Sequence, residues 1–317
     1  MINLGIIELG FREDSNAVQS IQDIIEYAIE AEKKGFSKFW LAEHHYSHIK
    51  NHPYSNAEIL LTLIAGMTDT IKLGTAGTSI NLYSPYHTAS NFKLLNNLFH
   101  GRISIGLSKG LPDSQYINSL ANKELSLETN FNLFNKNLET IVDLYEKEDE
   151  NLEEKKVLIP PFKGIKPEMC YLSTSTRNLS EALKYGLNYC ISTFHNFGQD
   201  INNLKITKEE INKFREDFYF KNDREPEISL SLAIVLKDTI EEAQTICDEI
   251  VENSRKQSSE PFIIIPVTLD LLEERLIKWK EEFAINNFII YDLATTNEEK
   301  LKNLELIGEK FNLLVTV

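Results

Sequence analysis

The sequence predicts a (β/α)8 barrel. The prediction depends on the length of the chain, the alternation of predicted strands and helices, and the lack of a GxGxxG motif. Short apolar segments alternate with segments of helical periodicity about eight times along the 317 residues. A chain of about 250 residues or more can close eight such parallel units into one barrel. The alternative is a doubly wound sheet, but Gly5 and Gly10 do not form the GxGxxG turn typical of that fold. We therefore expect residues 1–317 to form a single barrel domain.

The first half of the chain shows the alternation most clearly. An apolar strand at Asn3–Glu8 precedes a helix at Val18–Lys34, which places its isoleucines on one face. Gly35 ends that helix, since glycine readily adopts the left-handed conformation that follows a last helical turn. The pattern then predicts strands at Lys38–Ala42, Lys72–Ala76 and Arg102–Leu107, with helices at about Asn56–Met67 and Pro85–Leu98 between them.

The second half resumes the alternation after a long amphipathic helix at Leu127–Glu148. The charged run Glu146–Lys156 predicts a solvated helix end, and the three prolines of Lys155–Pro167 predict irregular structure. Five more strands are expected at Met169–Thr174, Tyr189–Ser192, Glu227–Leu236, Phe262–Ile265 and Asn287–Tyr291. The helices expected among them are Leu179–Tyr185, Lys208–Phe220, Thr239–Glu252, Leu269–Phe283 and Glu298–Phe311.

Composition excludes several classes of protein. Hydrophobic residues make up 42% and charged residues 26%, which is typical of a folded globular chain and not of a disordered one. The three cysteines, Cys170, Cys190 and Cys247, lack the spacing of a disulfide framework or a zinc site and fit a reducing cytosol. A net charge of −15 disfavours nucleic acid or an anionic membrane as a partner. No apolar run approaches the roughly 20 residues that span a bilayer, and a secretory signal is not recognisable, so we expect a cytoplasmic protein.

Four polar or small-residue clusters follow predicted strands. In a barrel, catalytic and binding groups lie just after the carboxyl ends of the strands, so the clusters should share one mouth. They are Glu43-His44-His45-Tyr46, Thr75-Ala76-Gly77-Thr78, Ser108-Lys109-Gly110 and Ser173-Thr174-Ser175-Thr176-Arg177-Asn178.

The hydroxyl-rich cluster Ser173–Asn178 opens a predicted helix and is a candidate anion site. Free backbone N–H groups and hydroxyls at a helix start suit a phosphate, although the same residues can simply cap the helix. Lys109 favours the phosphate interpretation because its ammonium group would lie at the end of the preceding strand. A solvated loop lysine is the alternative.

The histidines leave three interpretations open. His44 and His45 are adjacent, so on an extended chain they point to opposite sides and only one faces the mouth easily. A histidine there can act as a general base or a hydrogen-bond donor near neutral pH. His48 and His52 raise the alternative of a metal site, which the sequence Asn51-His52-Pro53 disfavours because it opposes a helix. Purely structural, hydrogen-bonded histidines are the third interpretation.

Small residues follow the third strand, at Gly74-Thr75-Ala76-Gly77. They would let a flat ring approach the backbone closely, or they could serve close packing between strand and helix.

Together these segments resemble the bacterial luciferase-like flavin monooxygenase family, whose fold is a (β/α)8 barrel. The likeness is dense over roughly the first 110 residues and looser afterwards, and the order and spacing of the motifs carry it. The matching segments are Phe39-Trp40-Leu41-Ala42-Glu43-His44-His45, Pro53–Leu61, Ile71-Lys72-Leu73-Gly74-Thr75-Ala76, Pro85, Ala89–Leu98, Gly101–Leu107, Tyr171–Leu187 and Leu272–Phe311.

The resemblance implies a site for flavin mononucleotide (FMN). Lys109 falls where the family commonly has a phosphate-binding arginine, a departure because lysine cannot form a two-pronged contact. Ser175 and Asn178, with Thr174 beside them, match phosphate contacts, and Ala76-Gly77 matches a cis peptide bond under the flavin ring. Ser108 stands at the position of a reactive cysteine in true luciferases.

The resemblance also implies a role for each member of the histidine pair. His44 is the first histidine of the Glu-His-His motif and would assist the reaction of flavin with oxygen, exchanging a proton near pH 7. His45 would be structural. Leu111-Pro112-Asp113 departs from the luciferase turn at that position, so the substrate cannot be carried over from the family.

Three functions remain open from the sequence. The first is a monooxygenase that uses reduced FMN, supplied by a separate flavin reductase, and O2 to oxidise a small or peptide-borne organic substrate. The second is an oxidoreductase that transfers hydride with the deazaflavin F420, which the acidic chain disfavours. The third is a non-catalytic partner subunit, which the intact Glu-His-His motif disfavours.

The resemblance further implies a homodimer formed through the helices near the second and third strands. The apolar residues of those helices are Ile59, Leu60, Leu63, Ile64, Phe92, Leu95 and Leu98. One face of each helix must pack on the barrel in any case.

Overall fold

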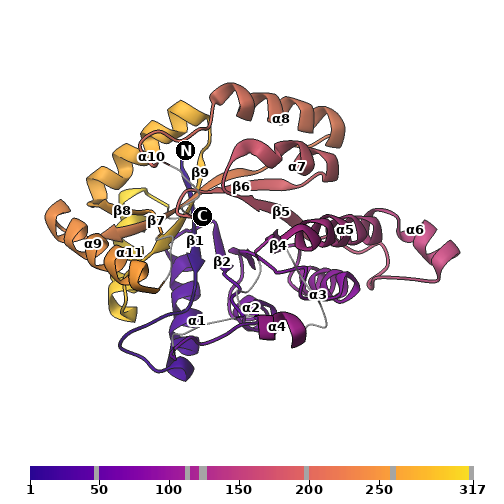
Figure 1. Cartoon of the computed structure of the whole chain (residues 1–317), viewed down its shortest axis with the longest axis horizontal. Helices are drawn as coiled ribbons and strands as arrows, with labels where there is room; N and C mark the ends of the chain where they lie inside the picture. The colour runs from indigo at the N-terminus through magenta and orange to yellow at the C-terminus, as the bar shows by residue number, and fades with distance from the viewer. Residues whose placement is uncertain (46–49, 111–114, 121–126, 196–199, 258–261, 314–317) are drawn as a thin grey trace.

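The computed structural model forms a closed barrel of eight parallel strands surrounded by helices, as the sequence predicts (Figure 1). It describes residues 1–45, 50–110, 115–120, 127–195, 200–257 and 262–313. The ring consists, in order, of β1 (Asn3–Glu8), β2 (Lys38–Leu41), β3 (Lys72–Thr75), β4 (Ile103–Leu107), β5 (Glu168–Ser173), β6 (Asn188–Ser192), β7 (Ile228–Leu236) and β9 (Asn287–Asp292). The ring closes because β9 pairs with both β7 and β1.

One additional strand lies outside this ring. β8 (Ile264–Val267) pairs in parallel with Ala233–Leu236 of β7, whereas β9 pairs with Ser229–Ile234 of the same strand. The strand expected at Phe262–Ile265 is therefore present at Ile264–Val267, but it pairs beside the last residues of the long β7 instead of entering the ring.

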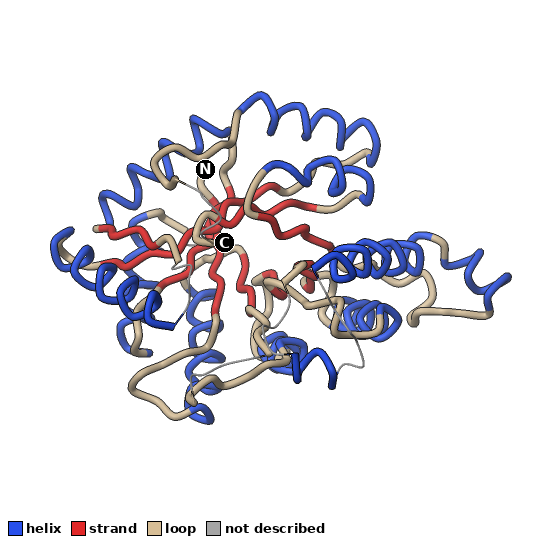
Figure 2. The backbone as a smooth tube through the Cα atoms, in the orientation of Figure 1, coloured by secondary structure: helices blue, strands red, loops and turns tan. Residues whose placement is uncertain are grey.

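Helices cover the outside of the barrel, and Figure 2 shows them as an outer layer around the central strands. They are α1 (Ala17–Lys33), α2 (Ala57–Ala65), α3 (Pro85–Leu98), α4 (Gln115–Leu120), α5 (Leu127–Glu146), α6 (Glu148–Glu150), α7 (Leu179–Tyr185), α8 (Lys208–Asn222), α9 (Ile240–Gln257), α10 (Leu269–Phe283) and α11 (Asn297–Lys310). Predicted and observed boundaries differ by a few residues, because helix ends depend on caps that periodicity does not reveal. Among the described helices, none combines the length and the apolar character that crossing a membrane requires.

The apolar interior has two layers. The larger layer lies between strands and helices, where residues such as Ile24, Phe92 and Leu276 are almost fully buried. The smaller layer fills the barrel itself. Its buried members are Ile7, Trp40, Ala42, Cys170, Cys190, Phe194, Ala233 and Ile289, with Leu9, Ala76, Leu172, Tyr291 and Leu293 packed against them. The barrel is therefore filled by side chains, and a ligand must bind at its mouth.

A buried ion pair holds the chain as it leaves β1. The Arg12 guanidinium contacts both carboxylate oxygens of Glu8 at 2.9 and 3.2 Å, and both side chains are almost fully buried. Lys300 lies 3.7 Å from the same carboxylate. Burial alone would raise the pKa of Glu8, but Lys300 and Arg12 outweigh it and lower the pKa to about 2.

The charged run after α5 is less solvated than the sequence suggests. Glu148 is buried and accepts a hydrogen bond from the buried Lys93 of α3 at 2.7 Å. Lys93 also donates to the Ile159 carbonyl at 3.0 Å. The expectation of a wholly solvated run is therefore wrong at Glu148, because a cation from another helix neutralises it.

Replacing Arg12 with methionine should destabilise the protein strongly. The substitution leaves the Glu8 carboxylate buried without its main partner, which typically costs about 3–5 kcal/mol of unfolding free energy. Urea unfolding followed by circular dichroism measures this loss. As a control, Lys33 pairs with Glu30 at 2.6 Å but is 61% exposed. Lys33→Met should therefore change stability by no more than about 0.5 kcal/mol. Equal effects of the two substitutions would contradict the interpretation.

Candidate functional site

The predicted site residues lie at one end of the barrel, because all its strands run in the same direction. His44 follows β2, Ala76-Gly77 follows β3, and Ser108-Lys109 follows β4. Thr174, Ser175 and Asn178 follow the last residues of β5. Tyr46, His48 and Leu111-Pro112-Asp113 lie outside the described residues.

Ala76 and Gly77 form a tightly packed shelf beside β4. The peptide bond between them is cis, as the resemblance implies. A Cβ atom added to Gly77 would lie 2.5 Å from Leu172 Cδ1 and 3.0 Å from both the Gly106 carbonyl oxygen and Ser108 Cβ. Gly77, Ser108 and Leu172 are packed so closely that a Cβ atom would not fit, and Leu172 and Ala76 pack against the apolar filling of the barrel. Small side chains beside this apolar filling suit a planar aromatic ligand.

Lys109 lies in a partly aromatic setting near the hydroxyl cluster. Its ammonium nitrogen is 5.2 Å from the centre of the Phe134 ring and 5.1 Å from that of Tyr171. The same nitrogen lies 3.4 Å from Glu181 Oε2. Burial lowers the pKa of Lys109, and Glu181 opposes that shift. Lys109 is therefore not the freely solvated loop lysine of the alternative interpretation.

The turn after β5 is organised by its own polar side chains. Ser173 Oγ accepts hydrogen bonds from the Ser175 backbone N–H at 3.4 Å and from the Asn178 side-chain amide at 3.1 Å. Ser175 caps a short 3-10 turn, Thr176–Asn178, that precedes α7. Tyr189 donates to the Ser175 carbonyl at 2.7 Å, and its ring stacks on Tyr171. Ser175 thus caps the short turn and not the helix that follows, and Asn178, at the start of α7, makes no side-chain cap to it.

The two adjacent histidines have different surroundings, as their alternation predicts. His45 Nε2 lies 2.7 Å from Glu43 Oε1 and 3.0 Å from the Tyr83 hydroxyl. Glu43 also accepts the Ser79 backbone N–H at 3.1 Å, which ties the end of β2 to the segment after β3. His45 is therefore part of a hydrogen-bonded network that fixes the wall of the mouth.

His44 belongs to a different group, the histidine cluster, which consists of His44, His52 and His195. The ring centres of His44 and His52 are 6.3 Å apart. Burial, with smaller contributions from the other histidines, lowers the pKa of His44 to about 4. Burial therefore favours a neutral His44 imidazole at pH 7 in the free protein, and the expected proton exchange during the reaction stays a prediction. A neutral imidazole can still accept a proton or donate one hydrogen bond.

His195 is a member of the cluster that the sequence interpretation missed. It follows β6, and its Nδ1 lies 2.6 Å from the Ser192 hydroxyl oxygen. Its ring packs between Phe194 and Phe262, and burial lowers its pKa to about 4. The available signal was its position just after a predicted strand, the same rule that selected the other clusters. Within the described part of the chain, no three His, Cys, Asp or Glu residues are placed to hold a metal ion.

Comparison with known proteins places the chain in a family. The family model described as luciferase-like monooxygenase matches residues 4–275. The chain therefore belongs to the luciferase-like monooxygenases, which confirms the resemblance seen in the sequence. The N-acetyl-S-alkylcysteine monooxygenase of Bacillus subtilis (strain 168) is 26% identical over 338 residues, covering 98% of each chain.

Solved structures agree on the fold. Apo-MsnO8 superposes with a TM-score of 0.80 at 22% identity, covering 99% of both chains. The oxygenating constituent of 3,6-diketocamphane monooxygenase from Pseudomonas putida, solved in complex with FMN, gives 0.67 at 15% identity, covering 98% of this chain and 97% of that one. An F420-dependent secondary alcohol dehydrogenase, in complex with an F420–acetone adduct, gives 0.70 at 15% identity, covering 99% of both chains. Of these structural neighbours, one was thus solved with FMN and one with F420.

The buried histidine should make the folded state sensitive to acid. The lowered pKa of about 4 means that the unfolded chain takes up a proton at His44 before the folded chain does. Stability contributed by the neutral form is thus lost as the pH falls from about 6.5 towards 4. With an unfolded value of about 6.5, His44 alone accounts for about 2 kcal/mol between pH 7.5 and pH 5.

Urea unfolding of the parent and of His44→Gln at these two pH values tests this expectation. The variant should lose about 2 kcal/mol less than the parent on acidification. His100→Asn is the control, because His100 is exposed and its positive φ suits asparagine. An equal loss in the parent and in His44→Gln would show that His44 is not held neutral by the fold.

Proposed function

We propose that this protein is a monooxygenase that uses reduced FMN and O2 to oxidise a small or peptide-borne organic substrate. The observation that carries the proposal is the arrangement of the mouth. In the order of the strands, the small residues Ala76-Gly77 after β3 lie between Lys109 after β4 and the half-buried His44 after β2. In this order, Lys109 would meet the flavin phosphate, Ala76-Gly77 the flavin ring, and His44 the reacting oxygen. Membership of a monooxygenase family supports the same conclusion.

The residues at the mouth fit FMN in most respects. Lys109, Ser175 and Asn178, with Thr174 beside them, supply a cation, hydroxyls and an amide of the kinds that bind phosphate. Ala76, Gly77 and Ser108 would lie against the ring, because their side chains are small and the barrel filling beside them is apolar. The Glu181 carboxylate is the feature that does not fit a phosphate.

His44 would act at the reacting end of the site. Reduced flavin, when bound, supplies the electrons that activate oxygen, so the protein must position groups and exclude water. A neutral His44 imidazole can accept a proton or donate a hydrogen bond there. His195 is hydrogen-bonded to Ser192 and lies in the same cluster. Its imidazole is a second group there that can accept a proton.

The cofactor can be tested directly against its alternative. The F420-dependent neighbour supports hydride transfer as the second candidate function. Anaerobic titration of the purified protein with reduced FMN and with reduced F420, followed by mixing with O2, separates the two. Tight binding of F420 with no binding of FMN would overturn the proposal. N-acetyl-S-alkylcysteines are the first substrates to test, because the Bacillus relative is named for them.

Replacing His44 with alanine should slow turnover without preventing flavin binding. The residues proposed to bind phosphate follow β4 and β5, whereas His44 follows β2, so FMN affinity should stay close to that of the parent. Turnover should fall by about 10²–10⁴, the usual contribution of general acid–base assistance. Stopped-flow mixing of the reduced-flavin complex with O2, together with a thermal melt, separates this role from a structural one. A lower melting temperature with unchanged turnover per folded molecule would remove His44 from the chemistry.

We also propose that the chain forms a homodimer through the outer faces of α2 and α3. Leu60, Ile64, Phe92 and Leu95 pack on the barrel, but the remaining apolar residues expected in the interface are exposed: Ile59 by 74%, Leu63 by 48% and Leu98 by 57%. Exposed apolar surface of this extent commonly marks a protein interface.

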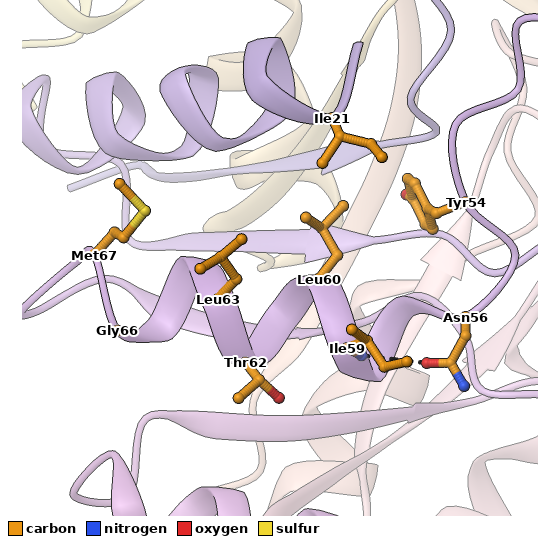
Figure 3. Close-up of a pocket in the computed structure, with 9 residues that line it drawn as sticks. All are labelled: Ile21, Tyr54, Asn56, Ile59, Leu60, Thr62, Leu63, Gly66 and Met67. Carbon is orange, nitrogen blue, oxygen red and sulfur yellow. Dashed lines mark hydrogen bonds between the residues drawn. The ribbon is translucent and has the colours of Figure 1, made fainter. Parts of the chain in front are cut away.

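A groove beside these residues adds to the apolar surface. It lies between α1 and α2, has a volume of about 720 Å³, and is lined by Ile21, Tyr54, Asn56, Ile59, Leu60, Thr62, Leu63, Gly66 and Met67. Figure 3 shows Leu60, Leu63 and Met67 pointing towards the α1 side of this groove. It lies between two helices outside the strand ring, and its lining is mostly apolar, so it supports an interface.

Changing Ile59 to glutamate should therefore convert the dimer into a monomer. A charge in the centre of an apolar interface is desolvated without a partner. Sedimentation velocity at micromolar concentration measures the change. Phe220→Glu is the matched control, because Phe220 is 94% exposed but lies on α8. A parent protein that sediments as a monomer would contradict the proposed dimer.

A further inference from the structure

The phosphate end of the proposed site contains a carboxylate as well as a cation. Glu181 lies in the first turn of α7, and its Oε2 is 3.4 Å from the Lys109 ammonium nitrogen. The same oxygen accepts a hydrogen bond of 2.6 Å from the Tyr171 hydroxyl. One carboxylate oxygen thus contacts both the Lys109 ammonium group and the Tyr171 hydroxyl.

The aromatic side chains around this pair keep it in place. The Tyr171 ring is buried, stacks on Tyr189 at 5.8 Å, and meets the edge of Phe134 at 5.9 Å. Lys109 lies over both Tyr171 and Phe134. The Lys109 side chain is 17% exposed, whereas that of Glu181 is 34% exposed. Glu181 is therefore the more exposed of the two side chains, and it is the one that can turn away from Lys109 into solvent.

We propose that Glu181 is an internal substitute for the flavin phosphate, which neutralises Lys109 in the free protein and must leave it when FMN binds. The inference rests on the proposed FMN function. Its consequence is that the protein discriminates only weakly between phosphorylated and unphosphorylated flavin and releases FMN readily.

The physical reason is the local balance of charge. A phosphate monoester carries a charge of about −1.5 to −2 at pH 7. With Glu181 in place, a single lysine faces both a carboxylate and the phosphate, so the phosphate meets repulsion as well as attraction. Lysine also lacks the fork geometry with which arginine could bind two anions at once. Binding must therefore displace Glu181 into solvent and break its hydrogen bond to Tyr171.

Replacing Glu181 with glutamine tests the inference, because the amide keeps the shape and the ability to accept from Tyr171 but removes the charge. Anaerobic titrations compare reduced FMN with reduced riboflavin, which differ only in the phosphate. Glu181→Gln should bind FMN about tenfold more tightly than the parent, equivalent to about 1.4 kcal/mol. Riboflavin affinity should change by less than about twofold, the size of a small perturbation. Lys109→Ala should have the opposite effect and weaken FMN selectively.

Two further variants keep the test decisive. Glu181→Ala also removes the charge, so it should tighten FMN in the same direction even if glutamine perturbs the turn. Glu281→Gln makes the same change of charge on α10, whose last residue, Phe283, leads into the start of β9 at the opposite end of the barrel. It should leave both affinities unchanged, and circular dichroism melts verify that each variant is folded.

The outcomes distinguish this inference from the proposed function. If both flavins bind and the removal of the Glu181 charge does not change the FMN-to-riboflavin ratio, the inference is wrong while the flavin function stands. If neither flavin binds to the parent or to the variants, the flavin function fails and this inference fails with it. A selective gain for FMN in both Glu181 variants supports the inference.

Discussion

The candidate site depends above all on the parallel closure of the strand ring, in which β9 pairs with β1 and β7. Because every strand of the ring runs the same way, residues far apart in sequence, such as His44 and His195, reach the same end of the barrel. The apolar filling of the interior then leaves the mouth as the place where a ligand can bind.

Burial at this mouth determines the chemistry of its side chains. His44 and His195 are held neutral because few compensating charges accompany them into the low-dielectric setting. Glu8 is buried more deeply but stays ionised, since Arg12 and Lys300 accompany it. The same physical effect thus produces neutral groups suited to proton transfer in one place and a fixed structural charge a few residues away.

At the lysine-containing end of the candidate site, one contact changes how strongly a residue attracts an anion. A lysine near hydroxyls is an anion site by composition, yet a carboxylate within 3.4 Å makes the local charge close to balanced. Under the proposed function, such a balance would let FMN leave more readily than strong phosphate binding allows.

The sequence by itself determined the alternation of strands and helices, the family motifs and the strand ends from which the site is built. Periodicity and order along the chain suffice for these, since parallel strands can be placed by pattern alone. Only the tertiary structure decided that β8 lies outside the ring and that Glu148 is buried on Lys93. It also decided that Glu181 meets Lys109, 72 residues away in the chain. Such contacts depend on which side chains share a low-dielectric space, and a linear pattern carries no information about that.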